Sequence, residues 1–170
     1  MGQRYTTEVR VRWSDLDAFG HVNNARTVTL LDGDDVRAHL SAGLGFSKAD
    51  RDTNVRRIGW VGAQIAKHGG LAVCAPIAPY AATRAEVRHL VEAEAGPGSF
   101  LLVHVATSLS ECEARDRKGL YARARRGEIA EFTGISDPYE EPTDAEITLD
   151  TRTSSVDQSA RLVLAHLLQG

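Results

Sequence analysis

Short apolar runs alternate with longer amphipathic stretches from residue 28 to the end of the chain, and this alternation limits the possible folds more than any other feature. Apolar runs that predict buried strands occupy residues 28–31, 71–77 and 100–106, with a short last one at 147–149. Helical spacing is found at residues 35–42, 48–67, 83–95, from 109 onward, and at 154–168. Strands separated by helices of this length form βαβ units, so the sequence predicts an α/β fold with a parallel sheet.

Size and composition favour a single soluble domain. The chain has 170 residues, of which 42% are hydrophobic and 25% charged, with a formal net charge of -3. That length suits one core and is short for two full domains. The charge and the absence of a long apolar run give no reason to expect a nucleic acid or a membrane as partner. Two cysteines without a ligand cluster predict neither a disulfide framework nor a zinc site, which fits a reduced cytoplasmic setting.

Charged residues follow the first apolar run directly. Asp32, Asp34 and Arg37 come after residues 28–31 and surround a glycine. In open α/β sheets, ligands bind beyond the carboxyl ends of the strands, so these side chains are expected to project into a cleft. The alternative is a polar turn that caps a helix beginning near Asp35. The residues of this stretch alone leave both interpretations open.

The N-terminal stretch has a pattern of its own. Residues 8–13 alternate apolar and polar side chains, which is typical of a half-exposed strand, and residues 14–24 are rich in turn formers. Together they read V-R-W-S-D-L-D-A-F-G-H-V-N-N-A, which resembles the signature of hotdog-fold acyl-CoA thioesterases over residues 5–26. That resemblance implies a general base or nucleophile at Asp17. The structural alternative for Asp17 is a solvated loop carboxylate.

A second resemblance covers residues 26–170. Its motifs are L-L-D-G-D-D-V-R, L-G-F-S-K-A-D-R-D-T-N-V-R-R-I-G, C-A-P-I-A-P-Y, E-C-E-A-R-D, G-L-Y-A-R-A-R and G-E-I-A-E-F-T-G-I-S-D-P-Y-E. In this order and spacing they resemble adenylylsulfate kinase. The resemblance implies a P-loop-kinase-like parallel sheet with helices on both faces. It also implies transfer of the γ-phosphate of ATP to adenosine 5'-phosphosulfate (APS) in sulfate assimilation, Mg²⁺ with the ATP, and a homodimer.

Site residues follow from this resemblance position by position. Asp34 corresponds to the partner of the acceptor hydroxyl and Asp32 to a neighbour of the magnesium, which suits a reaction that must orient its nucleophile. Arg37 and Arg51 correspond to the arginines that grip the phosphosulfate, because a guanidinium can hold an oxyanion with two hydrogen bonds. Asn54 corresponds to a polar contact on the same substrate.

The same resemblance places an adenine site among aromatic residues. Phe46 and Phe132 correspond to two rings that sandwich the base, and Ile77 belongs to the same substrate site. Base stacking on an aromatic ring contributes on the order of 1–3 kcal/mol. Core packing is the alternative role for either phenylalanine. Arg123 stands where the family usually has lysine, so the charge is kept while its geometry differs.

One family motif is absent from the printed sequence. The family begins with an apolar strand, the loop G-x-x-x-x-G-K-[ST] and a helix, whereas this chain contains no Gly-Lys pair. We therefore expect a kinase-like domain over residues 26–170 without the usual first strand, P-loop and first helix, preceded by a thioesterase-like segment at 1–25. Impaired ATP binding and turnover are expected. Two alternatives remain: a non-catalytic nucleotide-binding or dimerising module, and a thioesterase that uses Asp17.

Overall fold

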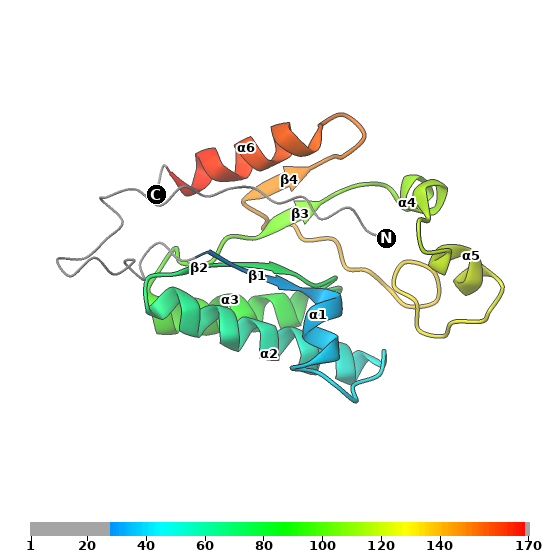
Figure 1. Cartoon of the computed structure of the whole chain (residues 1–170), viewed down its shortest axis with the longest axis horizontal. Coiled ribbons are helices and arrows are strands. Elements are labelled where there is room, and N and C mark those ends of the chain that lie inside the picture. The colour runs from blue at the N-terminus through cyan, green and yellow to red at the C-terminus, as the bar shows by residue number, and fades with distance from the viewer. Residues whose placement is uncertain (1–27, 169–170) are drawn as a thin grey trace.

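The computed structural model describes residues 28–168, which form an α/β arrangement of parallel strands and helices (Figure 1). This confirms the predicted fold class. In chain order the elements are β1 (Val28–Asp32), α1 (Gly33–Ala38), α2 (Lys48–Lys67), β2 (Leu71–Ala75), α3 (Ala81–Ala95), β3 (Val103–Val105), α4 (Leu109–Arg115), α5 (Leu120–Arg125), β4 (Ile147–Leu149) and α6 (Val156–Leu167). Asp17 and the rest of the thioesterase-like stretch before residue 28 lie outside the described residues.

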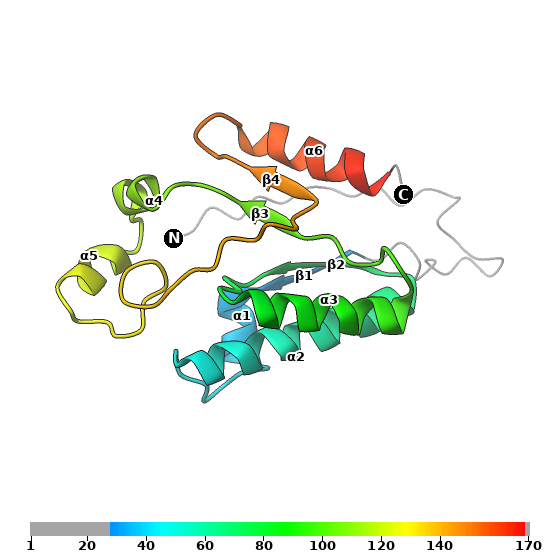
Figure 2. The same cartoon turned by 180° about the vertical axis from the view of Figure 1, so that it is seen from behind.

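The described strands form two parallel pairs. β1 pairs with β2 in a register that sets Leu30 opposite Val73, and β3 pairs with β4 so that Val105 lies opposite Leu149. Both views show the second pair beyond the first, with α2 and α3 together on the far side of β1 and β2 (Figures 1 and 2). Each strand leads out toward the same side of the molecule, where α1, α4 and α5 lie (Figure 1). The carboxyl ends of the strands therefore share one edge.

The core lies where α2 packs on α3. Val55, Ala63, Val87 and Val91 form its buried cluster. Helix α2 begins with Ser47, whose hydroxyl accepts a hydrogen bond from the Asp50 amide, as expected of an N-cap serine. The apolar spacing along α2 then directs one face to α3, and a glycine in that face lets the two helices approach closely.

The buried carboxylate of Asp52 on α2 joins the amino ends of α2 and α3 through the Thr83 hydroxyl. Asp52 accepts hydrogen bonds from Thr83 at 2.5 Å and from Lys48 at 2.7 Å. Burial raises the pKa of Asp52, but the bonds from Lys48 and Thr83 outweigh that effect and hold the pKa below its ordinary value. This carboxylate therefore stabilises the folded chain wherever it is ionised.

Substituting Asp52 by asparagine is expected to flatten the acid limb of the stability profile. A carboxylate with a lowered folded pKa contributes stability above its unfolded pKa, and this contribution is lost as the pH falls through the folded pKa. The free energy of unfolding of Asp52→Asn should be about 1–2 kcal/mol below wild type at pH 6 and nearly equal at pH 2.5. Urea unfolding at both pH values measures this. Asp157→Asn, at an exposed ion pair with Arg161 on α6, is the matched control and should change little at either pH.

The first strand is more exposed than predicted. Val28 and Leu30 are 59% and 65% exposed, so the expectation of a buried strand was wrong for these residues. Helix α2 covers only the face of β2 that carries Ala72 and Cys74. Val28 and Leu30 lie on the other face, in register with Leu71 and Val73, and no described element packs over them there. The strand predicted over residues 100–106 is likewise shorter, and none of β3 is buried.

Helix α6 is more exposed than the sequence predicts. Ser155 and Gln158 form the reciprocal cap that begins α6. The apolar residues predicted to line one face of this helix do not form a core contact, because no residue of α6 is buried and Leu164 is 55% exposed.

Helix α1 begins at Gly33 rather than at residue 35, because Asp32 caps it by accepting a hydrogen bond from the Asp34 amide.

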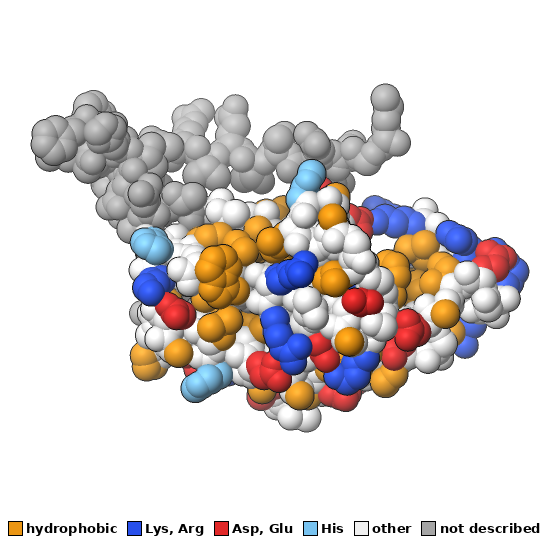
Figure 3. Space-filling view, turned by 90° about the horizontal axis from the view of Figure 1, so that it is seen from below, with side chains coloured by type: hydrophobic (Ala, Val, Ile, Leu, Met, Phe, Trp, Pro, Cys, Tyr) orange, Lys and Arg blue, Asp and Glu red, His pale blue; other side chains and the backbone are white. Residues whose placement is uncertain are grey.

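The underside of the molecule presents α2 and α3. Figure 3 shows acidic and basic side chains interspersed across this face around separate hydrophobic patches. Among the ion pairs of these two helices are Arg56 with Glu86 and Lys67 with Glu94. None of the helices between residues 28 and 168 is both long and apolar enough to cross a membrane.

Candidate functional site

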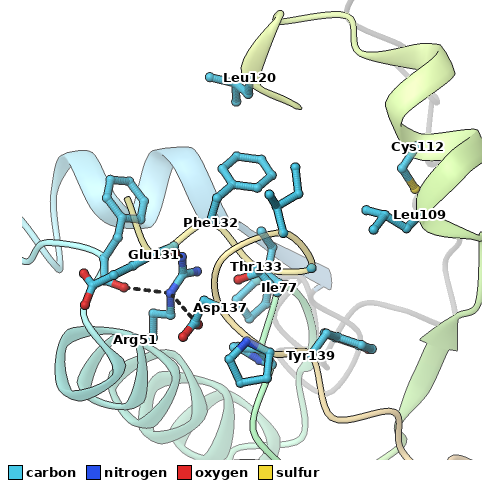
Figure 4. Close-up of a pocket in the computed structure, with 18 of the residues that line it drawn as sticks. Arg51, Ile77, Leu109, Cys112, Leu120, Glu131, Phe132, Thr133, Asp137 and Tyr139 are labelled. Carbon is cyan, nitrogen blue, oxygen red and sulfur yellow. Dashed lines mark hydrogen bonds and ion pairs between the residues drawn. The ribbon is translucent and has the colours of Figure 1, made fainter. Parts of the chain in front are cut away.

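A cavity of about 1630 Å³ opens at the shared carboxyl edge of the strands. Its walls come from the ends of β1 and β2, from β3, from α4 and α5, and from the loop after α5 (Figure 4). Every described residue that the sequence predicts for the site lines this cavity: Asp32, Asp34, Arg37, Phe46, Arg51, Asn54, Ile77, Arg123 and Phe132. Residues distant in sequence are thus brought to one place.

Two carboxylates form the end of the cavity next to β1. Asp32 Oδ1 accepts a hydrogen bond from the Asp34 amide at 2.9 Å and so caps α1. Asp34 Oδ2 accepts one from Lys118 Nζ at 2.7 Å, across 84 positions of sequence. The hydrogen bond to Asp34 raises the pKa of Lys118. Both interpretations of this turn are therefore realised in part, since Asp32 caps a helix while both carboxylates also line the cavity.

Arg37 packs against Phe46, the aromatic residue that forms one wall of the cavity. Its guanidinium lies 4.5 Å from the centroid of the Phe46 ring and donates to the Gly45 carbonyl at 2.9 Å. Burial, followed by repulsion from Arg51, lowers the pKa of Arg37. Two guanidinium groups near enough to repel each other create a positive potential that an anion would relieve.

Arg51 is buried and joins the two aromatic walls. Its Nε donates to the Phe46 carbonyl at 2.8 Å, and Nη2 donates to the Glu131 carbonyl, next to Phe132, at 2.5 Å. The same guanidinium lies 3.8 Å from Asp137 Oδ2 (Figure 4). Because one planar group reaches both loops, it fixes how far apart Phe46 and Phe132 stand. Neither of these two bonds uses Nη1.

Asn54 presents an unpaired polar atom. The side chain is 4% exposed, and its Oδ1 has no hydrogen-bond partner within residues 28–168. Asn54 follows Arg51 by one helical turn of α2, and both line the cavity. Buried amide groups are nearly always paired in folded proteins, so this oxygen in a cavity wall is a candidate acceptor for a ligand hydrogen bond.

The loop that carries Phe132 is tied to the body of the domain. Tyr80 is 4% exposed and its hydroxyl donates to Asp137 Oδ2 at 2.6 Å. Burial, together with this bond, raises the pKa of Tyr80 to about 12, so the hydroxyl stays protonated and keeps donating. Arg84 adds hydrogen bonds to the carbonyls of Ala78 and Glu140. The Phe132 ring meets Tyr121 edge to face, with 5.1 Å between centroids.

Three of these residues had no role in the sequence-based prediction. Lys118, Tyr80 and Asp137 lie within or beside recognised motifs, but their residue types alone indicate no contact with the site. Their roles depend on long-range pairs, which are Lys118 with Asp34 and Asp137 with both Arg51 and Tyr80. Ile77 is 63% exposed in the cavity wall, and Arg123 pairs with Glu128 at 3.4 Å.

Magnesium fits this site only as an ion that arrives with a nucleotide. No group of three or more histidine, cysteine or acidic residues within residues 28–168 could hold a metal ion. Of the acidic residues that line the cavity, Asp32 and Asp34 lie together at the end of β1, and Mg²⁺ typically takes one or two carboxylates together with phosphate oxygens and water. Asp32 is the better candidate, since Asp34 is already bound to Lys118.

Comparison with known families decides the assignment. The model of the adenylylsulphate kinase family matches residues 19–150. The chain belongs to the adenylylsulfate kinase family. A second model, for the C-terminal domain of acyl-ACP thioesterases, matches residues 1–33, most of which lie outside the described part. The family assignment is confirmed, whereas the predicted boundary between residues 25 and 26 stays a prediction.

Relatives with known names support the same family. A probable adenylyl-sulfate kinase of Synechocystis is 51% identical over 130 residues, covering 76% of this chain and 70% of the relative. The sulfate adenylyltransferase of Mycosarcoma maydis is 48% identical over 139 residues, covering 82% of this chain. The chain spans only 24% of the length of that protein, and 22% of the Emericella nidulans sulfate adenylyltransferase, to which it is 52% identical.

Solved structures of the family share the fold. The APS kinase of Mycobacterium tuberculosis in complex with AMPPNP and APS has a TM-score of 0.78 and 43% identity, covering 85% of this chain and 81% of that one. A hexameric APS kinase from Thiobacillus denitrificans has a TM-score of 0.62 and 42% identity, covering 85% of this chain and 23% of that one.

Proposed function

We propose that the chain binds APS in the cavity at the carboxyl edge of its strands. The observation that carries this proposal is the convergence of Arg37, Arg51 and the unpaired amide of Asn54 with Phe46 and Phe132 in one cavity. The two guanidinium groups suit the phosphosulfate, and the amide can bond a sugar or base atom. The rings of Phe46 and Phe132 suit the adenine.

The residues at the end of β1 suit the acceptor side of phosphoryl transfer. Asp34 would orient the 3'-hydroxyl and accept its proton, and Lys118, which now holds Asp34, fixes the position of that carboxylate. Asp32 would contact the magnesium that accompanies ATP. Magnesium, when bound, supplies neutralisation of the developing phosphate charge. Arg123 on α5 adds positive charge to the cavity wall.

Turnover is expected to be impaired. A phosphate loop cradles the β- and γ-phosphates with backbone amides and a lysine, and the printed sequence lacks the Gly-Lys pair that this requires. Electrostatic stabilisation of this kind is usually the largest single contribution to catalysis. The chain should therefore bind the acceptor substrate and transfer phosphate slowly or not at all.

Assaying the formation of 3'-phosphoadenosine 5'-phosphosulfate tests this proposal. With saturating APS and Mg·ATP, the full chain should form no product above the enzyme-free blank, while APS still protects it against thermal unfolding. Asp34→Asn is the control for a contaminating kinase. Product made by the chain itself should disappear in this variant, whereas product made by a contaminant should persist. Turnover at rates typical of kinases, about 1–100 s⁻¹, would contradict the expected impairment.

Two other functions remain as proposals of lower rank. The match to a thioesterase model over residues 1–33 is the observation in favour of a thioesterase, and Asp17 is its candidate catalytic residue. Exposed apolar side chains on β1 and α6, such as Leu30 and Leu164, favour a dimerising module, and a homodimer is the assembly that we propose. The breadth of the kinase match supports ranking APS binding above both alternatives.

A further inference from the structure

Two residues in the cavity wall have a backbone conformation that favours glycine. Within residues 28–168, the non-glycine residues with φ in the left-handed region are Ala78 at +31° and Glu131 at +53°. Both line the cavity. The proline after Ala78 adds a further restriction, because a residue before proline prefers extended conformations. Left-handed residues of this kind persist only where surrounding contacts hold them, and they gather at ligand sites.

A buried arginine holds each of these two residues. Arg84 Nη1 donates to the Ala78 carbonyl at 2.8 Å. Arg51 Nη2 donates to the Glu131 carbonyl at 2.5 Å. Both arginines are 7% exposed. Hydrogen bonds from an ionised donor are stronger than those between neutral groups, so each of these bonds can offset the cost of the left-handed conformation.

We propose that Arg84 is a positioning residue for APS, because it holds Ala78 in the left-handed conformation and thereby directs the neighbouring Ile77 into the cavity. This inference rests on the proposed function and extends it to a residue that does not line the cavity itself. Ile77 comes directly before Ala78 and is 63% exposed in the cavity wall (Figure 4). An apolar side chain with this exposure gains from being covered by an apolar part of the ligand, and the adenine of APS offers such a surface.

The guanidinium of Arg84 also fixes the turn that carries Ala78 against the loop after α5. Its Nη2 donates to the Glu140 carbonyl at 2.6 Å, and the Glu140 amide donates to the Pro79 carbonyl at 2.9 Å. The same guanidinium lies 6.0 Å from the centroid of the Tyr139 ring, which stacks on His104 of β3 at 6.1 Å. Arg84 therefore joins the end of β2 to the opposite side of the cavity.

A purely structural role for Arg84, as an anchor of α3, is the alternative. Arg88 has such a role one helical turn later. It pairs with Glu146 at 2.6 Å and lies 4.8 Å from the centroid of the Phe100 ring. Arg88 does not line the cavity, and none of these contacts involves a left-handed residue. It is therefore the matched control for a loss of packing that leaves the cavity unchanged.

Calorimetric titration of the full chain with APS tests the inference. Arg84→Met keeps the length of the side chain but removes both donors, so Ala78 should leave the left-handed region. We expect its affinity for APS to fall at least about tenfold, whereas Arg88→Met should stay within about twofold of wild type. Adding Ala78→Gly to Arg84→Met should bring the affinity back to within about threefold of wild type, since glycine adopts a positive φ without support.

Nuclear magnetic resonance of the isoleucine methyl groups follows the same step without a ligand. The resonance of Ile77 is identified by its loss in Ile77→Val. It should move in Arg84→Met, return when Ala78→Gly is added, and stay in place in Arg88→Met. If APS fails to bind the wild type, the proposed function is overturned, and the Ile77 resonance still shows whether Arg84 positions this side chain.

A further variant covers the case in which Arg84→Met does not fold by circular dichroism. Ala78→Val leaves Arg84 intact, and a β-branched residue very rarely has a positive φ, so this variant should also bind APS at least about tenfold more weakly. Affinity within about threefold of wild type in the folded Arg84→Met or Ala78→Val variant would overturn the inference. So would equal losses in Arg84→Met and Arg88→Met, no recovery on adding Ala78→Gly, or an unmoved Ile77 resonance.

Discussion

The variant Arg51→Ala is expected to bind APS about a hundredfold more weakly than the wild type, while the chain stays folded. The guanidinium of Arg51 holds the Phe46 carbonyl and the Glu131 carbonyl and lies 3.8 Å from Asp137. Truncation removes a candidate ligand of the phosphosulfate and also the connection between the two aromatic walls. A charged hydrogen bond contributes about 1.5–3 kcal/mol, and a hundredfold loss corresponds to about 2.7 kcal/mol.

Two further variants separate the contributions of Arg51. Arg51→Lys keeps the charge but cannot reach two carbonyls with one planar group, so its affinity for APS should lie between those of wild type and alanine. Arg57→Ala is the matched control on the same helix, because Arg57 is exposed and donates to the Leu40 carbonyl outside the cavity. Calorimetry measures all three. An affinity of Arg51→Ala within about threefold of wild type would contradict the assigned role.

Gly59→Ala is expected to lower the free energy of unfolding by about 2 kcal/mol. A Cβ at this position would lie 2.6 Å and 2.8 Å from the two methyl carbons of Val87, inside the contact between α2 and α3. Overpacking of this kind costs about 1–3 kcal/mol and exceeds the gain in helix propensity of about 1 kcal/mol. Urea unfolding at neutral pH measures the difference.

A second substitution on each side tests the cause. Val87→Ala removes the two methyl groups, so adding Gly59→Ala to a chain that already carries Val87→Ala should cost little or nothing. Gly62→Ala is the control on the same helix, where the nearest atom, Cys74 Sγ, lies at 3.5 Å, an ordinary contact. Gly62→Ala should be neutral or stabilising. Equal destabilisation by both alanine variants would show that α2 does not pack on α3 through Gly59.

Local sequence patterns predicted the order of strands and helices with one exception: the single helix expected from residue 109 is two helices, α4 and α5. The helix at residues 48–67 was predicted with its observed bounds, since its apolar spacing ends at Gly69-Gly70. The structure adds the N-cap at Ser47. The strand at 147–149 was likewise predicted as observed. The exposure of Val28 and Leu30 was not, because apolar, β-branched residues predict a strand but do not reveal whether another element covers its second face.

The nine described residues that the motif resemblance assigns to the site, from Asp32 to Phe132, line one cavity, and their roles there stay a prediction. Their internal contacts were not predicted. The bond from Arg51 to the Glu131 carbonyl spans 80 positions, and that from Lys118 to Asp34 spans 84. Neither can be deduced from local spacing. The first requires the loop after α5 to return to α2, and the second requires the turn between α4 and α5 to reach α1. The hydrogen bond between Tyr80 and Asp137 likewise depends on the fold of the loop after α5 and could not be predicted from the sequence.

Calorimetric titration of the full chain with APS, in the absence of ATP, tests most directly whether the acceptor site is present. We expect saturable heat with one APS per chain, and no saturable heat when Mg·ATP replaces APS. This result would show that the cavity lined by Arg37, Arg51 and Asn54 binds the acceptor without a phosphate loop. No saturable binding of APS to a chain that is folded by circular dichroism would contradict the proposed function.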